Sequence, residues 1–172
     1  MSRHVRTVHY EVRPALAADL PAVAALQSHG FGSQPAGQAA AVTGELESPD
    51  RWLWVAIAQA DAADHARPVA YARLRLADIS TEPPIGYYLS GVVVDPGHRG
   101  QGVGGQLIGA RMDFAWSAGA PALYYFANSR NTASIAMHAK FGFREVKRPF
   151  RFPGVAFEDG VGVLFRLERP TA

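Results

Sequence analysis

The stretch from Val92 to Gly105, VVVDPGHRGQGVGG, constrains the fold more than any other part of the chain. An apolar strand ends at Asp95-Pro96, and four glycines follow within six residues, at the start of a segment with a helical pattern. The first backbone N–H groups of a helix have no intrahelical partner, and the helix dipole adds a partial positive charge there. The pattern therefore predicts a strand, turn and helix that bind an anion, with Arg99 gripping phosphate oxygens. A glycine-rich turn without a ligand is the alternative.

Two common nucleotide motifs resemble this pattern without matching it. Gly100, Gly102 and Gly105 satisfy G-x-G-x-x-G, but a dinucleotide site also needs an acidic residue about 20 positions later. The next predicted strand ends at Asn128, and no carboxylate follows it before Glu145. A Walker loop is excluded because no Gly-Lys-Ser/Thr follows the glycines.

The remaining pattern, Arg99-x-x-Gly102-x-Gly104 directly after Val-Asp-Pro, resembles the coenzyme A loop of the GCN5-related N-acetyltransferase (GNAT) family. A second match lies in residues 131–143, NTASIAMHAKFGF, where Asn131 and a terminal Gly-Phe stand at the family's spacing. The resemblance covers most of the chain, from residues 12–14 to the last strand near Val163. It implies an α/β fold in a single domain, residues 1–172 with a core at about 8–168. A mixed central sheet with a splayed parallel strand pair would be flanked by about four helices.

The resemblance also implies acetyl-CoA or coenzyme A as the cofactor. The loop would hold the pyrophosphate, and the central strand would pair with the pantetheine arm and polarise the thioester carbonyl through a backbone N–H. The residues carried over as cofactor-binding are Val92, Val93, Val94, Arg99, Gly100, Gln101, Gly102, Val103, Gly104, Gly105, Asn131, Ser134 and His138.

The proton-transfer residues are less clearly marked. His138 occupies the position at which the family carries a Tyr that protonates the leaving thiolate. An imidazole with a pKa near 6.5 is mostly neutral at neutral pH but keeps one N–H donor. His138 is therefore either the general acid or a cofactor contact, or else a packing or solvent-facing residue. Asn131 caps its helix, contacts the cofactor, or does both. For the base, a water chain using the Tyr88 hydroxyl and the backbone of Ser90 or Gly91 is as plausible as a single carboxylate.

Composition limits the class of protein. The chain has 172 residues and is 48% hydrophobic, which suits one buried core. No apolar run reaches the roughly 20 residues of a membrane span, and the N-terminus lacks the apolar core of a signal peptide, so we expect a cytoplasmic protein that does not bind membranes. Zero cysteines exclude disulfides and thiol catalysis, and scattered histidines predict no metal site. A net charge of +2 and one short basic run, residues 147–152, argue against nucleic-acid binding.

Hydrophobic periodicity predicts the order of elements. Strands are expected at residues 10–13, 52–58, 69–76, 87–94, 122–127, 144–147 and 161–167, and helices at 18–27, 38–47, 104–118 and 131–141. In the strand at 69–76, even-numbered apolar residues alternate with Tyr71, Arg73 and Arg75, which predicts one buried and one wetter face.

The leading functional hypothesis is an acetyl-CoA-dependent N-acetyltransferase that acts on a primary amine of a small molecule or peptide by direct attack. The alternative is a non-catalytic acyl-CoA-binding or sensing domain, and a nucleotide-binding oxidoreductase ranks third. Phe31 and Phe152 are the candidate acceptor-binding residues. The nearby Lys147, Arg148 and Arg151 favour an acceptor with an anionic group. A homodimer is one open alternative for the oligomeric state.

Overall fold

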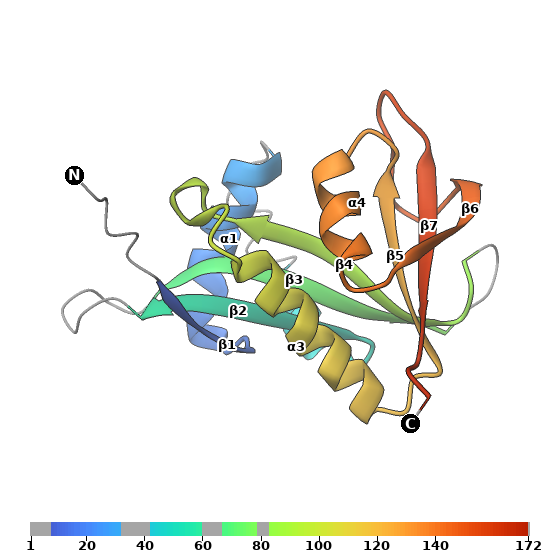
Figure 1. The fold of residues 1–172 in the computed structure, drawn as a ribbon. Coiled ribbons are helices and arrows are strands. Elements are labelled where there is room, and N and C mark those ends of the chain that lie inside the picture. Colours follow the sequence, from blue (N-terminus) through green and yellow to red (C-terminus); the bar gives the residue numbers. More distant parts are fainter. Residues whose placement is uncertain (1–7, 32–41, 60–66, 79–82, 172) are drawn as a thin grey trace, which may run out of the picture. The chain divides into compact units, whose positions relative to one another are not determined.

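A computed structural model describes residues 8–31, 42–59, 67–78 and 83–171 (Figure 1). The strands pair in the order β1-β2-β3-β4-β5-β7-β6 in one seven-stranded sheet, which confirms the predicted mixed α/β class. In chain order the elements are β1 (His9–Pro14), η1 (Ala17–Asp19), α1 (Leu20–Phe31), helical residues 42–47, β2 (Arg51–Gln59), β3 (Pro68–Ala77), β4 (Gly86–Val94), η2 (Pro96–His98), α3 (Val103–Ser117), β5 (Ala122–Asn128), α4 (Thr132–Ala139), β6 (Arg144–Phe150) and β7 (Gly162–Glu168).

The predicted parallel strand pair is β4 and β5. Their register runs from Tyr87 opposite Leu123 to Leu89 opposite Tyr125. Beyond Leu89, β4 continues to Val94 without a further partner on β5 in the described register. The antiparallel pair of β5 and β7, by contrast, is in register along the whole length of both strands. The predicted parallel pair is therefore confirmed, and its described register ends at Leu89 and Tyr125.

The predicted element positions are confirmed, with shifts at their ends. The first helix begins as a short 3₁₀ turn, because the Asp19 carboxylate accepts hydrogen bonds from the Leu16 backbone N–H (2.7 Å) and the Arg13 guanidinium (2.7 Å). The strand predicted at 144–147 extends to Phe150. Residues 38–41 of the second predicted helix lie outside the described residues. In the part of the chain that is described, no helix is long and apolar enough to cross a membrane.

The chain divides into two compact units, each made of two separate segments. The first unit comprises Met1–Ala72 and Gly91–Ala110, and the second comprises Arg73–Ser90 and Arg111–Ala172. Strands β3 and β4 and helix α3 each contribute residues to both units. The single domain at 1–172 stays a prediction.

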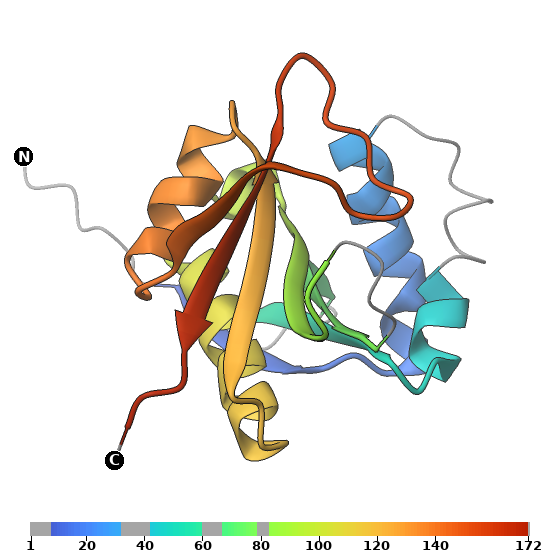
Figure 2. The ribbon, with the colours of Figure 1, turned by 90° about the vertical axis from the view of Figure 1, so that its right-hand side faces the viewer.

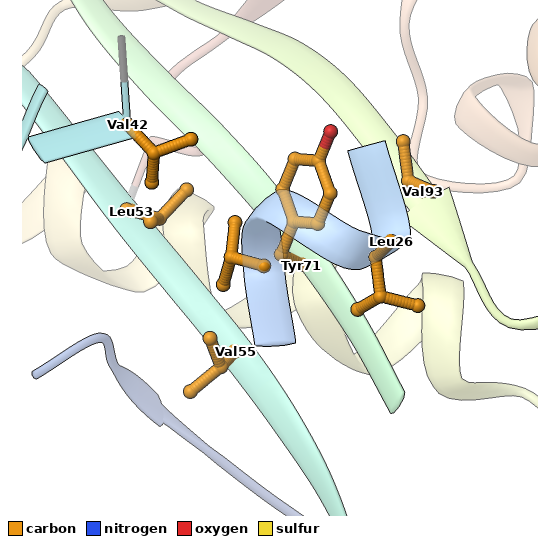
Figure 3. Close-up of a cluster of buried hydrophobic side chains, with 7 residues drawn as sticks. Leu26, Val42, Leu53, Val55, Tyr71 and Val93 are labelled. Carbon is orange, nitrogen blue, oxygen red and sulfur yellow. The ribbon is translucent and has the colours of Figure 1, made fainter. Parts of the chain in front are cut away.

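The core of the first unit lies between α1 and strands β2, β3 and β4 (Figure 3). Tyr71 is fully buried in it, which contradicts the prediction of a wetter face for this residue. The reason is that α1 packs over that face of β3 and contributes Val23 and Leu26 to the same cluster. The cluster consists of Val23, Leu26, Val42, Leu53, Val55, Tyr71 and Val93.

Strand β5 lies between β4 and β7 in the sheet (Figure 2). The core of the second unit is largely aromatic and includes residues of these three strands. Tyr88 stacks on Tyr124 with ring centroids 5.1 Å apart, and Phe152 stacks on Phe126 at 4.6 Å. Offset or tilted ring pairs of this kind add stability beyond their buried area. This cluster places the chain segment after β6 against β4 and β5.

Arg111, on the buried face of α3, was missed by the sequence analysis. Its side chain is fully buried, and Nη1 donates to the carbonyl oxygens of Arg73 (2.8 Å) and Ser90 (3.2 Å). Burial lowers the pKa of Arg111 to about 9, so the guanidinium stays charged at neutral pH. It links β3 and β4 through their backbones within the second unit.

Replacing Leu53 with Ala should show how much the first core contributes. Leu53 is 2% exposed, whereas Leu16 is 59% exposed and serves as the matched control. A buried Leu→Ala change costs about 2–5 kcal/mol because it removes contacts and leaves a cavity. Urea unfolding should therefore show a loss of about 2–5 kcal/mol for Leu53→Ala and less than about 0.5 kcal/mol for Leu16→Ala. Equal losses would contradict this description of the core.

Candidate functional site

The turn from β4 into α3 is shaped by Asp95. Its backbone N–H donates to the Val69 carbonyl (2.8 Å), which ties the end of β4 to β3. Its carboxylate accepts from the Gly97 N–H (2.8 Å), and its carbonyl accepts from the His98 N–H (2.9 Å). Asp followed by Pro is a favoured start for such a turn. The strand therefore ends at a defined point, and the chain is directed into the glycine run.

The glycine run, residues 100–105, presents a row of unused backbone donors. Gly100 and Gly102 have positive φ values of 74° and 83°, which side-chain-bearing residues rarely adopt. The helix begins at Val103, and the Gln106 N–H makes the bond to the Gly102 carbonyl at 3.2 Å. Within the described parts of the chain, no N–H group of residues 100–105 donates a hydrogen bond. The predicted strand, turn and helix are present, and the binding of an anion by this turn stays a prediction.

Arg99 precedes the glycine run and is exposed. Its Nε donates to the Val94 carbonyl at 3.1 Å, which anchors the base of the side chain. Neither Nη atom has a hydrogen-bond partner among the described residues. Two guanidinium donors are thus available for phosphate oxygens.

One loop contact was not predicted. The Tyr10 hydroxyl on β1 lies 3.0 Å from His98 Nδ1 and 3.0 Å from Gln101 Oε1. Nothing in the sequence signals a contact between residues about 90 positions apart.

At the start of α4, Asn131 is the N-cap. Its side-chain oxygen accepts from the Ser134 N–H at 3.2 Å, so the capping role that the sequence left open is present. The Ser134 hydroxyl lies 2.7 Å from the Tyr125 hydroxyl of β5. Both polar side chains of this helix face thus make contacts inside the second unit, and their role as cofactor ligands stays a prediction.

His138 is buried, with 2% of its side chain exposed. Its ring stacks on Tyr125 with centroids 3.6 Å apart and an interplanar angle of 6°. Nδ1 lies 2.9 Å from the Ser134 carbonyl, which can only accept, so Nδ1 carries the proton of the neutral ring. Nε2 has no hydrogen-bond partner among the described residues. Burial is the main reason that the pKa of His138 is lowered to about 4. The hydrogen bond to Ser134 raises this pKa, and the positive charge of Arg111 lowers it further.

The remaining candidate residues are Tyr88, Phe152 and Phe31. The Tyr88 hydroxyl donates to the Pro84 carbonyl at 2.7 Å, and burial raises the pKa of Tyr88 well above its ordinary value. Its role as a proton relay stays a prediction. Phe152 is buried within the aromatic core and also lines a pocket. The side chain of Phe31 lies outside the described residues.

The pocket belongs to the second unit and has a volume of about 580 Å³. Arg151 supplies the one charged side chain among the described residues that line it, and Arg75 lies over the Phe152 ring at 5.1 Å. Arg148, in contrast, forms a bidentate pair with Glu145 at 2.9 and 2.8 Å. The lining is otherwise apolar or glycine: Pro83, Pro149, Phe150, Phe152, Pro153, Val155, Phe157, Gly160, Val161 and Gly162.

The predicted cofactor residues thus fall into two groups. Val92, Val93, Val94 and residues 99–105 lie together in the first unit, whereas Asn131, Ser134 and His138 lie together in the second. Residues 24–143, which include both groups, match the family model described as the acetyltransferase (GNAT) family. The chain belongs to the GNAT family.

Solved structures agree with this GNAT assignment at the level of the fold. Arabidopsis thaliana NAA60 in complex with acetyl-CoA superposes with a TM-score of 0.73 at 15% identity, over 93% of this chain and 98% of that one. The aminoglycoside N-acetyltransferase AAC(6')-Iy in complex with CoA gives 0.73 at 19% identity, over 88% and 99%. The ribosomal-protein-S18-alanine N-acetyltransferase of Escherichia coli gives 0.67 at 18% identity, over 95% and 96%.

Among curated proteins, an uncharacterized protein of Mycobacterium leprae (strain TN) is 38% identical over 72 residues. The match covers 41% of this chain and spans 19% of the length of that relative.

The lowered pKa of His138 should make the stability of this GNAT protein depend on pH. In the unfolded chain the His138 ring takes up a proton below about pH 6.5, whereas in the folded protein it does so only near pH 4. Lowering the pH from 6.5 to 4 therefore favours unfolding. The shift corresponds to about 3 kcal/mol. His138→Phe keeps a ring against Tyr125 but cannot titrate.

Urea unfolding at pH 7 and pH 4.5 should therefore show a larger loss of stability in the wild type than in His138→Phe, by about 2–3 kcal/mol. NMR titration of the His138 ring should find it neutral throughout pH 5–8. Equal losses in the two proteins, or a ring that protonates near pH 6.5, would contradict the burial of a neutral imidazole.

Proposed function

We propose that this chain is an N-acetyltransferase that moves the acetyl group of acetyl-CoA to a primary amine of a small molecule or peptide. The row of unused N–H donors at residues 100–105 is the observation that supports the proposal most strongly. In this assignment these donors and the Arg99 guanidinium bind the pyrophosphate of the cofactor. Membership of the GNAT family and the CoA-bound structures of similar fold point in the same direction.

The pantetheine arm would lie along Val92, Val93 and Val94. This part of β4 extends beyond the register with β5, so its backbone can pair with the two amides of the arm. A backbone N–H there would also donate to the thioester carbonyl oxygen as negative charge develops on it.

The reaction itself is a direct attack. The neutral amine nitrogen forms a bond to the thioester carbon, the C–S bond breaks, and the electron pair leaves with sulfur as the CoA thiolate. The nitrogen loses one proton and the thiolate gains one. Both can be exchanged through water, with the Tyr88 oxygen as an acceptor along the path.

For His138 we favour the packing role over the general-acid role. Its single ring proton is already donated to Ser134, and its pKa of about 4 leaves it no second proton at neutral pH. This same observation favours the second candidate function, a GNAT-fold domain that binds acyl-CoA without catalysis. Release of free thiol from acetyl-CoA in the presence of amines distinguishes the two functions.

The acceptor would bind in the pocket lined by Phe152 and Arg151. Apolar walls with a single charged residue suit an amine that carries a hydrophobic group and an anionic group, such as an amino acid or a peptide end. Arg148 contributes less than the sequence indicated, because its charge is paired with Glu145. Polyamines, which offer only positive charge, would be poor acceptors.

Acetyl-CoA and CoA should raise the melting temperature, whereas NADH should not. A ligand that binds only the folded state at a hundredfold excess over its Kd stabilises it by about 2.7 kcal/mol. Gly104→Val should remove most of this shift, because its side chain would meet the bound pyrophosphate.

Gly109→Val is the matched control, since Gly109 lies on the same helix with nothing within 4 Å of an added Cβ. It should keep the full shift with CoA. A rise in melting temperature with NADH and none with CoA would contradict the proposed function. Normal CoA binding by Gly104→Val would show that the glycine run is a turn without a binding role.

Arg151→Gln should raise the KM for an anionic amine about three- to fivefold, the size expected for one partly exposed ion pair. The KM for acetyl-CoA should not change. Arg148→Gln is the control and should leave both values near those of the wild type. Phe152→Leu is preferable to Phe152→Ala, because Phe152 also packs against Tyr88 and Phe126. Faster acetylation of spermidine than of every anionic amine tested would contradict the charge argument.

A further inference from the structure

Strand β1 contacts the turn between β4 and α3 through the Tyr10 side chain. Tyr10 belongs to a strand at the start of the chain, yet its hydroxyl oxygen lies 3.0 Å from both His98 Nδ1 and Gln101 Oε1. The Tyr10 and His98 rings also meet edge to face, with centroids 5.8 Å apart. These three residues lie in the first unit.

The direction of each hydrogen bond follows from counting protons. Gln101 Nε2 donates to the Gly97 carbonyl at 2.9 Å, which sets the orientation of the amide and leaves Oε1 to accept. The single hydroxyl proton of Tyr10 therefore goes to Gln101 Oε1. The same hydroxyl oxygen must then accept from His98, so the His98 proton lies on Nδ1.

The resulting chain of bonds runs from His98 to Tyr10 to Gln101 and back to the Gly97 carbonyl. It uses side chains and one carbonyl, and it leaves the N–H groups of residues 100–105 unoccupied. Gly100 and Gly102, on either side of Gln101, have positive φ and no atom within 4 Å of where a Cβ would be. The glycine run is therefore held by the side chains of the two residues that lie between its glycines: Gln101 through its hydrogen bond to Gly97, and Val103, which is 2% exposed.

We propose that Tyr10 is a positioning residue for the pyrophosphate of coenzyme A. By holding Gln101 and His98, its hydroxyl orders the glycine run before the ligand arrives, so that less conformational entropy is lost on binding. This inference rests on the proposed function, because it assigns the loop to the cofactor.

Tyr10→Phe is the direct test, since it removes one oxygen and keeps the ring. Loss of a hydrogen bond of ordinary net strength should weaken CoA binding about three- to tenfold. The KM for acetyl-CoA should rise by the same factor, and kcat at saturating acetyl-CoA should stay near the wild-type value. Tyr124→Phe is the matched control, because the Tyr124 hydroxyl donates to no described residue and lies in the second unit.

Acetyl-pantetheine carries the thioester but no pyrophosphate. It therefore distinguishes a loss of pyrophosphate binding from a general loss of activity. Tyr10→Phe should lower kcat/KM for acetyl-CoA three- to tenfold and leave kcat/KM for acetyl-pantetheine unchanged. Equal losses with both substrates would overturn the inference, as would unchanged binding of CoA.

Two further measurements cover the remaining outcomes. Gln101→Ala breaks the same chain of bonds with Tyr10 intact, so it should weaken CoA binding even if Tyr10→Phe fails to fold. The effects of two substitutions within one hydrogen-bond network do not add. The double variant should therefore bind CoA only slightly more weakly than Gln101→Ala alone. Full additivity would overturn the inference. If the wild type binds no CoA, the proposed function fails, whereas equal binding by wild type and Tyr10→Phe overturns the Tyr10 role alone.

Discussion

The unsatisfied backbone N–H groups at the start of α3 are the constraint on which the proposed cofactor site depends. A loop that binds an anion has to be ordered without using the donors that the anion needs. Asp95 ends β4 through contacts that lie before the glycine run, and Gln101 anchors that run through its side chain. Positive φ at Gly100 and Gly102 turns the chain without a bulky side chain in the way. Each of these interactions spares the N–H groups of residues 100–105.

In the second unit, three buried polar side chains have the opposite property, because each already donates a proton to a backbone carbonyl. His138 donates to Ser134, Tyr88 donates to Pro84, and Arg111 donates to Arg73 and Ser90. Burial without a partner would be costly, so these contacts stabilise the fold. They also explain why we assign proton transfer to water rather than to His138. A group whose proton is held by a carbonyl and whose pKa is about 4 is a poor general acid at neutral pH.

The similar structures carry names with very different acceptors, an aminoglycoside in one and a ribosomal-protein alanine in another, on closely similar folds. Fold alone therefore does not specify the acceptor. In this chain the proposed acceptor pocket is lined mainly by the segment between β6 and β7. There, aromatic side chains pack into the core and also line the pocket, while Arg151 supplies its charge. Under the proposed function, acceptor choice and core packing depend on the same residues.

The order of elements, the glycine-rich turn before a helix and the GNAT assignment could all be predicted from the sequence. These rest on local rules: an apolar run makes a buried strand, Asp-Pro ends it, and glycines permit positive φ beside a helix start. The burial of Tyr71 and Arg111, the contact of Tyr10 with Gln101 and the position of the proton on His138 became visible in the folded chain. Each of these depends on which distant segment packs against the residue. Burial, hydrogen-bond partners and pKa are set by that packing, and the periodicity of a single segment carries no information about it.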